Sequence, residues 1–349
     1  MLLNALVDYI YKDSFNCQFR EKVANLKNNK ENFIKFYRKY LFLEVRNPLL
    51  KYLITKHYLD YVEIEIFSYC NRQCWFCPNS FIDRHSENIF MKEETYLKIL
   101  DELKSIGFKG GITYSRYNEP TSDKIFLTRL KQARERLPEA FLFTHSNGDY
   151  ITREYLDELA DAGLNLIRLQ CYMNKNETFD IENVVKPKML KYVERIGLPY
   201  KVNIENKTCY ELEFEHPKLS IIVEAHDFEH SIGVNRGETI EGMPVYERMK
   251  PCLSPFRRMY IDFDGSVMPC CQVRHDVESH KNMIMGNVEK ESIFEIFTGK
   301  RFAELRKHLG GFGIKKHPCT TCTATEADCV FDKCHKEYII NTKKTFKKL

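Results

Sequence analysis

The sequence contains no long apolar run and no large excess of either charge sign. No stretch approaches the roughly 18 consecutive apolar residues that a membrane-spanning helix requires. The 53 Lys and Arg residues nearly balance the 49 Asp and Glu residues, leaving a formal net charge of +4, which argues against a dedicated nucleic-acid binder. The amino terminus has no basic n-region before Asp8, which argues against a secretory signal. We therefore expect a cytoplasmic protein with no membrane or nucleic-acid partner.

Cysteine, in contrast, is abundant, with 13 residues among 349. In a reducing compartment so many thiols are better explained by metal ligation than by a disulfide framework. The hydrophobic share of 43% is enough for a packed core. The length exceeds one average domain and suits a barrel with an appendage.

A strand pattern followed by a helix pattern repeats between residues 57 and 245. In the first strand, Val62, Ile64 and Ile66 alternate with two acids. Strands alternating with helices predict a parallel sheet with right-handed crossovers, and five or six units predict a partial (β/α)6 TIM-type barrel. We expect the later strands at 111–117, 141–145, 165–171, 201–205 and 231–235. We expect helices at 123–136, 153–162 and 184–196, besides one after the first cysteine loop.

The rest of the chain divides into three further parts. Residues 1–56 carry apolar side chains at helical spacing, which predicts an N-terminal helical extension. After Arg248 the tight-turn pair Asp264-Gly265 predicts a hairpin, and apolar positions from 293 to 309 predict one helix. We therefore predict a barrel domain at 57–245, a small cysteine-rich domain at 246–340 and a basic tail at 341–349.

The first cysteine loop directly follows the first predicted strand. Cys70, Cys74 and Cys77 have the spacing C-x3-C-x2-C. Three thiolates on one short loop can occupy three corners of a cubane iron–sulfur cluster, which leaves the fourth iron open to a substrate or cofactor. A structural zinc ion would need a fourth ligand nearby, and His85 is poorly placed to supply it.

This loop resembles the signature of the radical S-adenosylmethionine (SAM) superfamily, including the aromatic Phe76 before the last cysteine. The resemblance implies a catalytic [4Fe–4S] cluster whose open iron chelates SAM. It further implies that reduction, by a partner such as flavodoxin or ferredoxin, cleaves SAM to methionine and a 5′-deoxyadenosyl radical. That radical abstracts a hydrogen atom from the substrate.

Further features of the predicted barrel are similar to the SAM-binding segments of that family. The segment from Ser115 to Pro120 looks like its Gly-Glu-Pro segment, with Asn118 where glycine is common. The resemblance implies that Glu119 accepts a hydrogen bond from the SAM ammonium group. For Arg168 a structural ion pair is an equal alternative. The other residues to which the resemblance assigns SAM contacts are Ser146, Asn147, Gln170 and Asn203.

The C-terminal cysteines form a second pattern, C-x12-G-x4-C followed by C-x2-C. It resembles the auxiliary-cluster domains called SPASM and, in the shorter form, Twitch. The resemblance implies one auxiliary [4Fe–4S] cluster held by Cys252, Cys270, Cys319 and Cys322.

Two alternatives to this ligand set stay open. Cys329 and Cys334 depart from the SPASM spacing, and no cysteine follows Cys334. A two-cluster arrangement would pair Cys334 with Cys252 and Cys270, leaving Cys319, Cys322 and Cys329 one thiolate short. A structural zinc site is the other alternative. Cys271 is a spare thiol beside a ligand.

The leading functional hypothesis is an oxidoreductase of the dehydrogenase type. It would abstract hydrogen from a sugar, cyclitol or nucleotide-sugar, and the auxiliary cluster would accept the second electron. The alternatives are a maturase of a ribosomal peptide, a sugar epimerase, and a protein that uses its clusters only for electron transfer or as a scaffold. For an epimerase, Cys171 or Tyr172 at the end of the fourth strand could return a hydrogen atom, although core packing is the simpler role for Cys171.

Overall fold

The computed structural model describes residues 38–228, 235–243, 245–322 and 324. Several sequence predictions lie outside these ranges: the first 37 residues of the helical extension, Cys329 and Cys334, and the basic tail at 341–349. Most of the strand predicted at 231–235 also lies outside them. Asn235, its one described residue, is not in a strand.

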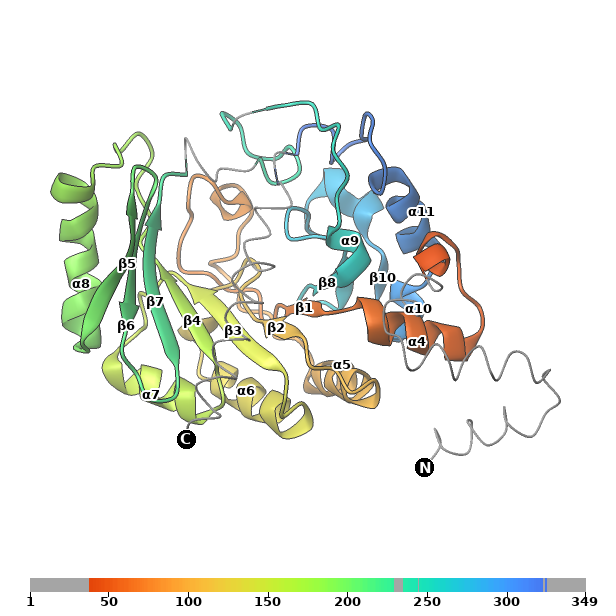
Figure 1. Ribbon diagram of the computed structural model, residues 1–349, viewed down its shortest axis with the longest axis horizontal. Helices are drawn as coiled ribbons and strands as arrows, with labels where there is room; N and C mark the ends of the chain where they lie inside the picture. The colour runs from red at the N-terminus through yellow and green to blue at the C-terminus, as the bar shows by residue number, and fades with distance from the viewer. Residues whose placement is uncertain (1–37, 229–234, 244, 323, 325–349) are drawn as a thin grey trace.

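A single ten-stranded sheet, in the order β10-β9-β8-β1-β2-β3-β4-β7-β6-β5, forms the body of the protein (Figure 1). The six neighbouring strands from β8 to β7 in this order run parallel. The predicted α/β class with a parallel, partial-barrel sheet is therefore confirmed. The parallel strands are β1 (Tyr61–Ile64), β2 (Gly111–Thr113), β3 (Phe141–Ser146), β4 (Leu166–Gln170), β7 (Ser220–His226) and β8 (Arg258–Ile261).

The fifth and sixth parallel strands are not the segments that we predicted. Residues 201–205 lie in β5 (Tyr200–Asn206), an edge strand antiparallel to β6 (Cys209–Phe214). The fifth parallel strand is β7, and the sixth is β8, which pairs with β1. Periodicity could not distinguish these cases, because it identifies a strand but does not select the strand's neighbours.

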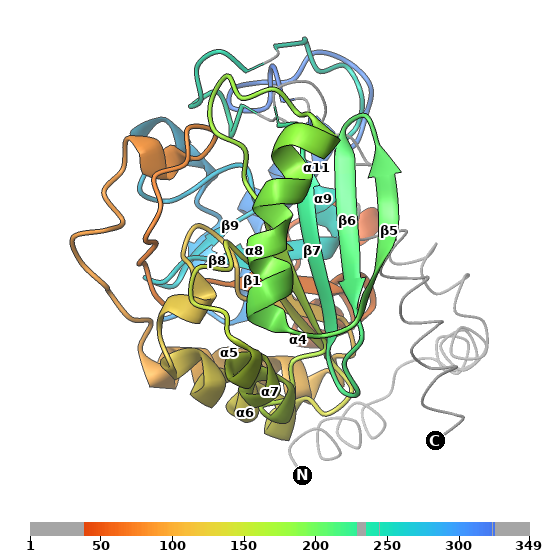
Figure 2. The ribbon, with the colours of Figure 1, turned by 90° about the vertical axis from the view of Figure 1, so that its left-hand side faces the viewer.

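Four helices cover one side of the sheet: α5 (Glu93–Ser105), α6 (Ile125–Arg136), α7 (Arg153–Asp161) and α8 (Lys186–Ile196) (Figures 1 and 2). The three helices predicted at 123–136, 153–162 and 184–196 are thus confirmed within a few residues. The Thr152 side chain caps α7 by accepting from the Tyr155 amide. Gly197 ends α8 in the left-handed region, with φ of 62°, where glycine carries no Cβ penalty.

The helix predicted over 293–309 is two helices, α10 (Ile293–Phe297) and α11 (Lys300–Leu309). Ser292 and Glu295 form a capping box at the start of α10. At Gly299, between the helices, a Cβ atom would lie 2.7 Å from the Glu295 carbonyl oxygen, so the chain breaks where only glycine fits. The other described helices are η1 (Arg38–Phe42), α4 (Pro48–Tyr58), η2 (Pro78–Ser80), η3 (Pro120–Ser122), η4 (Ile181–Val185), α9 (Ser254–Arg257) and η5 (Glu278–Met283).

The C-terminal part of the chain continues the sheet. After β8, the predicted hairpin forms with β9 (Ser266–Met268), and β10 (Gly286–Asn287) adds to its edge. The Asp264-Gly265 turn has Gly265 at φ of 81°, as a tight turn of this kind requires. The sheet is therefore continuous across residue 245, and its two edge strands, β5 and β10, lie on either side of that residue in the sequence.

The two sides of the sheet differ in character. On the side covered by α5 to α8, which we call the helix side, buried aliphatic residues form the main core. On the opposite side, which we call the inner side, there is a separate buried cluster: Tyr61, Phe143, Leu166, Ile222 and Tyr260. Further along the strands the inner side carries charged groups such as Glu65, Arg168 and Glu224.

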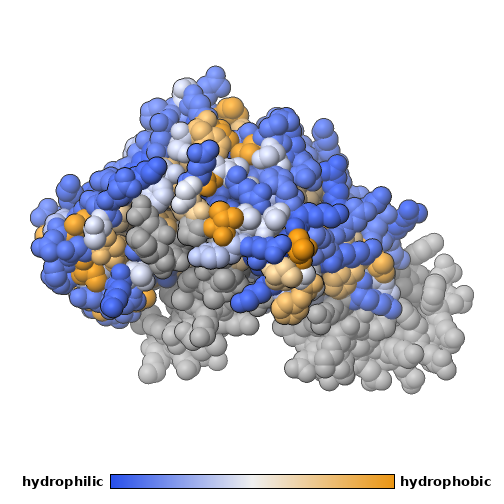
Figure 3. All heavy atoms as spheres, turned by 90° about the horizontal axis from the view of Figure 1, so that it is seen from above, coloured by the Kyte–Doolittle hydropathy of each residue, from blue (hydrophilic) through white to orange (hydrophobic). Residues whose placement is uncertain are grey.

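The surface seen from above carries mostly hydrophilic side chains, with apolar ones in small separate groups (Figure 3). No helix in the described part of the chain is long and apolar enough to cross a membrane.

Candidate active site

The C-x3-C-x2-C loop lies at the carboxyl end of β1, as the barrel architecture predicts. We call Cys70, Cys74 and Cys77 the catalytic-loop cysteines. The loop is held by backbone hydrogen bonds, including Cys77 N to Cys74 O at 2.9 Å and Cys70 N to the carbonyl oxygen of Arg84 at 2.9 Å. All three thiols are half-buried and none forms a disulfide.

The environment of these thiols suits an iron–sulfur cluster. Burial raises the pKa of Cys70 and of Cys74 to about 12, and charge repulsion from the neighbouring thiols adds to the shift. Metal binding replaces such protons, because the thiolate is the ligand. Within the described residues, no three Cys, His, Asp or Glu side chains converge as they would around a single metal ion. In a cubane cluster each thiolate binds a different iron, so the cysteines surround the cluster rather than one ion.

Glu119 is the centre of a buried polar cluster beside this loop. Its Oε1 accepts hydrogen bonds from Thr121 Oγ1 at 2.6 Å, Thr121 N at 3.0 Å and Ser146 Oγ at 2.8 Å. Its Oε2 accepts from Asn147 N at 2.7 Å. Burial outweighs these bonds and raises the pKa of Glu119, whose charge also acts on Cys70. The structure thus brings together Glu119, Ser146 and Asn147, which the sequence had assigned to one ligand.

Arg168, Gln170 and Asn203 lie elsewhere, in a polar network on the inner side. Arg168 Nη1 donates to Glu211 at 3.0 Å and also to Glu224. Gln170 donates to Glu224, and Asn203 donates to Glu211. Arg168 thus forms the structural ion pair that the sequence analysis gave as the alternative to a SAM contact.

Cys171 and Tyr172 face different surroundings because they are neighbours at the end of a strand. Cys171 belongs to the core on the helix side, where burial raises its pKa to about 11. Tyr172 packs against Phe76, with ring centroids 5.0 Å apart, and Phe76 stacks on Phe228 at 4.2 Å. Of the two, Tyr172 is the one that lies beside the catalytic-loop cysteines, whose charges raise its pKa further after burial.

The C-terminal cysteines also come together. We call Cys252, Cys270, Cys319 and Cys322 the auxiliary cysteines. Burial raises the pKa of Cys270 well above its usual range, and charge repulsion from Cys271 and the other three auxiliary cysteines adds to this. Four thiols that lie this close together can each bind one iron of a [4Fe–4S] cluster, so together they can ligate the cluster fully. Cys329 and Cys334 lie outside the described residues.

A second buried charge network on the inner side escaped the sequence analysis. Arg116 donates to Asp262, and Asp262 Oδ2 lies 2.6 Å from His275 Nδ1. Glu63 lies 3.8 Å from Arg116 Nη1, and burial raises the pKa of Glu63 to about 7. The signal was present: Glu63 and Glu65 alternate with aliphatic residues in a strand whose every residue is buried. We had not concluded that these acids face an enclosed polar space.

Arg236 connects the surroundings of the two cysteine groups. Burial lowers the pKa of Arg236, but the electrostatic effects of the nearby Tyr117, Cys271 and Cys77 side chains outweigh burial and raise it overall. Its Nη1 donates to Gln272 Oε1 at 3.4 Å, whereas its buried Nε has no partner among the described residues. Its backbone has φ of 48°, which is uncommon for a residue other than glycine.

Nearby, Tyr117 Oη donates to the carbonyl oxygen of Cys271 at 2.7 Å, and the Asn79 side chain donates to the Tyr117 carbonyl at 2.8 Å. Asn79, Tyr117 and Cys271 thus form a hydrogen-bonded link from the catalytic loop towards the auxiliary cysteines, and we call the polar region around this link the inner chamber. Its described lining includes Tyr117, Arg236 and Gln272.

A parallel (β/α) sheet with a three-cysteine loop after its first strand and a four-cysteine group at its far edge defines an iron–sulfur enzyme. The family described as "Radical SAM superfamily" matches residues 64–190. The SPASM family, described as "Iron-sulfur cluster-binding domain", matches residues 252–323. The chain belongs to the radical SAM superfamily and carries a C-terminal SPASM region. It is an oxidoreductase that uses a [4Fe–4S] cluster with SAM and carries at least one auxiliary iron–sulfur cluster.

Two curated relatives and one solved structure are similar over most of the chain. The S-adenosyl-L-methionine-dependent 2-deoxy-scyllo-inosamine dehydrogenase of Niallia circulans is 25% identical over 263 residues, covering 75% of this chain and 91% of that protein. The PqqA peptide cyclase of Bradyrhizobium diazoefficiens is 25% identical over 322 residues, covering 76% and 79%. The crystal structure of BtrN in complex with AdoMet and 2-DOIA has a TM-score of 0.55 at 23% identity, covering 76% of this chain and 94% of that one. This last similarity shows the shared fold.

Proposed function

We propose that the protein oxidises a small polar molecule, such as a sugar, cyclitol or nucleotide-sugar, by hydrogen abstraction followed by loss of a second electron. The observation that carries this proposal is a set of hydrogen bonds between the two cysteine groups. Arg236 donates to Gln272, which follows Cys271, and Tyr117 links Cys271 to Asn79, two residues after Cys77. A substrate held there would lie between the two clusters. The similarity to the dehydrogenase of Niallia circulans, which is named for 2-deoxy-scyllo-inosamine as its substrate, supports this class of reaction.

The reaction needs two redox sites close to one carbon atom. SAM bound at a cluster on Cys70, Cys74 and Cys77 would supply the radical that removes the hydrogen atom. A cluster on the auxiliary cysteines would accept the remaining electron, and the hydroxyl proton would be released as the carbonyl group forms. The chain must hold the hydroxyl groups of the substrate and exclude water. Arg236, with its unpaired buried Nε, offers a hydrogen-bond donor for those hydroxyl groups.

The proposed SAM contacts follow from the buried hydrogen-bonded groups around Glu119. We propose that Glu119 accepts from the SAM ammonium group, that Ser146 and Asn147 hold Glu119 in place, and that Phe76 packs against the adenine ring. Stacking between Phe76 and Phe228, with ring planes 11° apart, provides a flat apolar surface of the kind that a purine ring contacts. Arg168, Gln170 and Asn203 would form part of the chamber wall instead of contacting SAM directly.

A peptide maturase is the second candidate, because the PqqA peptide cyclase covers a similar share of this chain. Such an enzyme would bind an extended peptide rather than a single small molecule. An epimerase is a third; Tyr172 lies closer to the catalytic loop than Cys171 does and would be the first hydrogen donor to test.

The test is an anaerobic assay of the reconstituted enzyme with SAM, a reductant, and panels of cyclitols, sugars and nucleotide-sugars. The proposal expects one ketone product for each 5′-deoxyadenosine. Arg236→Gln should keep reductive SAM cleavage while losing most ketone formation. An epimerised product without oxidation, or turnover confined to peptides, would refute the proposal. Arg236→Lys is the matched variant, since it keeps the charge but loses the planar guanidinium.

A further inference from the structure

Arg248 is a buried arginine that precedes the auxiliary Cys252 in the chain, and only 8% of its surface is exposed. Its guanidinium donates to four backbone carbonyl oxygens: those of Lys250 at 3.2 Å, Pro251 at 2.8 Å, Cys322 at 3.3 Å and Ala324. These acceptors are neutral, and no carboxylate pairs with Arg248 among the described residues. This part of the chain therefore holds a full positive charge without an acidic partner.

The same hydrogen bonds place the guanidinium between two segments that carry auxiliary cysteines. Pro251 directly precedes Cys252, and Cys322 is itself one of the four. The Arg248 amide also donates to the Thr320 carbonyl oxygen at 2.7 Å, so both the backbone and the side chain of Arg248 join the two segments. Burial raises the pKa of Cys252, and the charge of Arg248 opposes that shift.

The charge of Arg248 also acts on the other segment. Burial raises the pKa of Cys322, whereas the charge of Arg248 and a hydrogen bond from its side chain lower it. At Cys319, burial and the neighbouring thiols raise the pKa to about 12; Arg248 opposes this shift and the charge of Glu238 adds to it. Glu238 is itself paired with His317, at 2.7 Å from Nδ1. Three of the four auxiliary thiols therefore lie within the field of this one buried cation.

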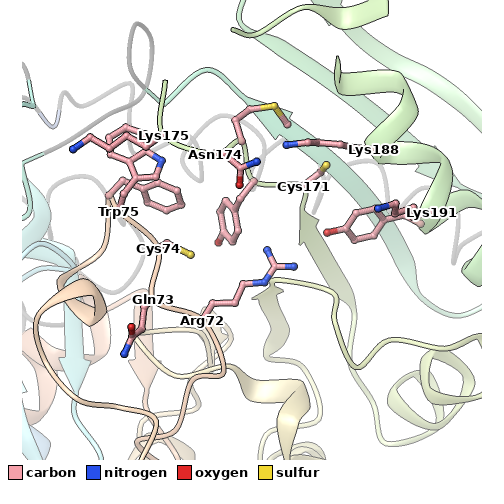
Figure 4. Close-up of a pocket in the computed structure, with 13 residues that line it drawn as sticks. Arg72, Gln73, Cys74, Trp75, Cys171, Asn174, Lys175, Lys188 and Lys191 are labelled. Atoms are coloured by element: carbon pink, nitrogen blue, oxygen red, sulfur yellow. The ribbon is translucent and has the colours of Figure 1, made fainter. Parts of the chain in front are cut away.

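The catalytic loop has a different charge balance. Figure 4 shows Arg72 and Cys74 beside the pocket at this loop. Arg72 is paired with Asp149, with Nε 2.7 Å from Oδ2, so its charge is compensated. Burial raises the pKa of Cys70, and the negative charge of Glu119 raises it further. The cation without a carboxylate partner thus belongs to the auxiliary group and not to the catalytic loop.

We propose that Arg248 is a fixed positive charge that raises the reduction potential of the auxiliary cluster and so makes that cluster the electron acceptor. Four thiolates make a cluster anionic, and reduction adds one more negative charge, which a nearby buried cation stabilises. In the proposed oxidation the substrate radical loses one electron, the auxiliary cluster gains it, and the hydroxyl proton is released as the carbonyl group forms. The acceptor role rests on the proposed function, whereas the effect on the potential rests only on a cluster at the auxiliary cysteines.

The experiment compares Arg248→Gln, which removes the charge, with Arg248→Lys, which keeps it but loses the planar guanidinium. Both changes are made in the full-length chain with the catalytic-loop cysteines replaced by alanine, so that the signal of reduced iron–sulfur clusters comes only from the auxiliary region. The matched control is Lys307→Gln, which removes an exposed positive charge from α11. This helix contacts the same region, because its Leu309 carbonyl accepts from Cys252 N at 2.9 Å.

The measurements are the iron content and the midpoint potential, the latter from a reductive titration followed by electron paramagnetic resonance. We expect Arg248→Gln to make reduction less favourable by about ten-fold or more, which is about 59 mV or more for one electron. Arg248→Lys should shift the potential much less. The control should change it little, because solvent and salt screen an exposed charge.

An unchanged potential in Arg248→Gln would overturn the proposal. An equal shift in Arg248→Gln and Arg248→Lys would also overturn it, because the hydrogen bonds and not the charge would then set the potential. Loss of iron from both variants would assign Arg248 to the folding of this region alone. Loss of iron from Arg248→Gln only, with an unshifted potential in Arg248→Lys, would support the requirement for the charge. A shifted potential in an enzyme that forms no ketone would refute the proposed oxidation and leave the effect of Arg248 on the potential standing.

Discussion

Replacing Glu119 with glutamine separates the function of this carboxylate from its role in the fold. Glu119 is buried and accepts four hydrogen bonds, three through Oε1 and one through Oε2 from Asn147 N. In Glu119→Gln the amide oxygen can keep the three bonds to Oε1. The amide nitrogen that replaces Oε2 then faces the Asn147 N–H. One hydrogen bond is therefore lost and the buried Asn147 N–H is left unpaired, at a cost of about 1–3 kcal/mol.

The loss of charge has the opposite effect on stability. Burial raises the pKa of Glu119, so the folded chain holds a proton there more tightly than the unfolded chain does. This residue therefore opposes folding at neutral pH, and its contribution becomes more favourable as the pH falls. A neutral glutamine removes that penalty. We expect the two effects to offset each other largely, leaving the Tm of the variant within a few degrees of the unmodified protein.

SAM binding should respond much more strongly. A charge-assisted hydrogen bond from the SAM ammonium group contributes about 1.5–3 kcal/mol, so the Kd should rise about ten- to one-hundred-fold. Titration calorimetry with SAM on the anaerobically reconstituted enzyme measures this. For the unmodified enzyme, affinity should fall as the pH drops through the raised pKa of Glu119, and the variant should lack that decrease.

The matched control is Glu94→Gln, which removes the same charge from an exposed position on α5. Its SAM affinity should not change. If Glu119→Gln binds SAM as tightly as the unmodified protein, Glu119 does not contact SAM, and the four hydrogen bonds serve only the fold.

Three further predictions concern the clusters and the inner network. Replacing the catalytic-loop cysteines with alanine should abolish reductive SAM cleavage and leave about four irons per chain with one auxiliary cluster, or seven to eight with two; 5′-deoxyadenosine from this variant would contradict the assignment. Replacing the auxiliary cysteines with serine should stop substrate oxidation but keep SAM cleavage, whereas zinc in the purified protein would show a structural domain. Burial lowers the pKa of His226, but Cys209 and Glu224 raise it to about 10, so its stabilising contribution should be lost as the pH rises from about 6.5 towards 10. Urea unfolding of His226→Gln should lack that decline, and an identical decline would exclude His226 as its source.

The local parts of this site could be predicted because they depend on short spacings along the chain. Three cysteines within eight residues can reach three corners of one cluster in almost any loop that follows a strand. The family resemblance assigned Glu119, Ser146 and Asn147 to one ligand, and the structure brings them together because loops after neighbouring parallel strands meet at one edge of the sheet. The helices at 125–136, 153–161 and 186–196 followed from their apolar periodicity.

Only the tertiary structure decided which strands are neighbours and which side each residue faces. Residues 258–261 pair with β1, and this pairing places Cys270 and Cys319 against the inner cluster of Tyr61 and Tyr260. Arg168 turned inward to Glu224, whereas Cys171 faced the helices. Such outcomes depend on contacts between residues up to two hundred positions apart, and alternation along one strand does not specify them. The sequence therefore predicted the two cysteine groups and their ligand chemistry, and the long-range pairing of the sheet decided where the auxiliary group lies relative to the catalytic loop.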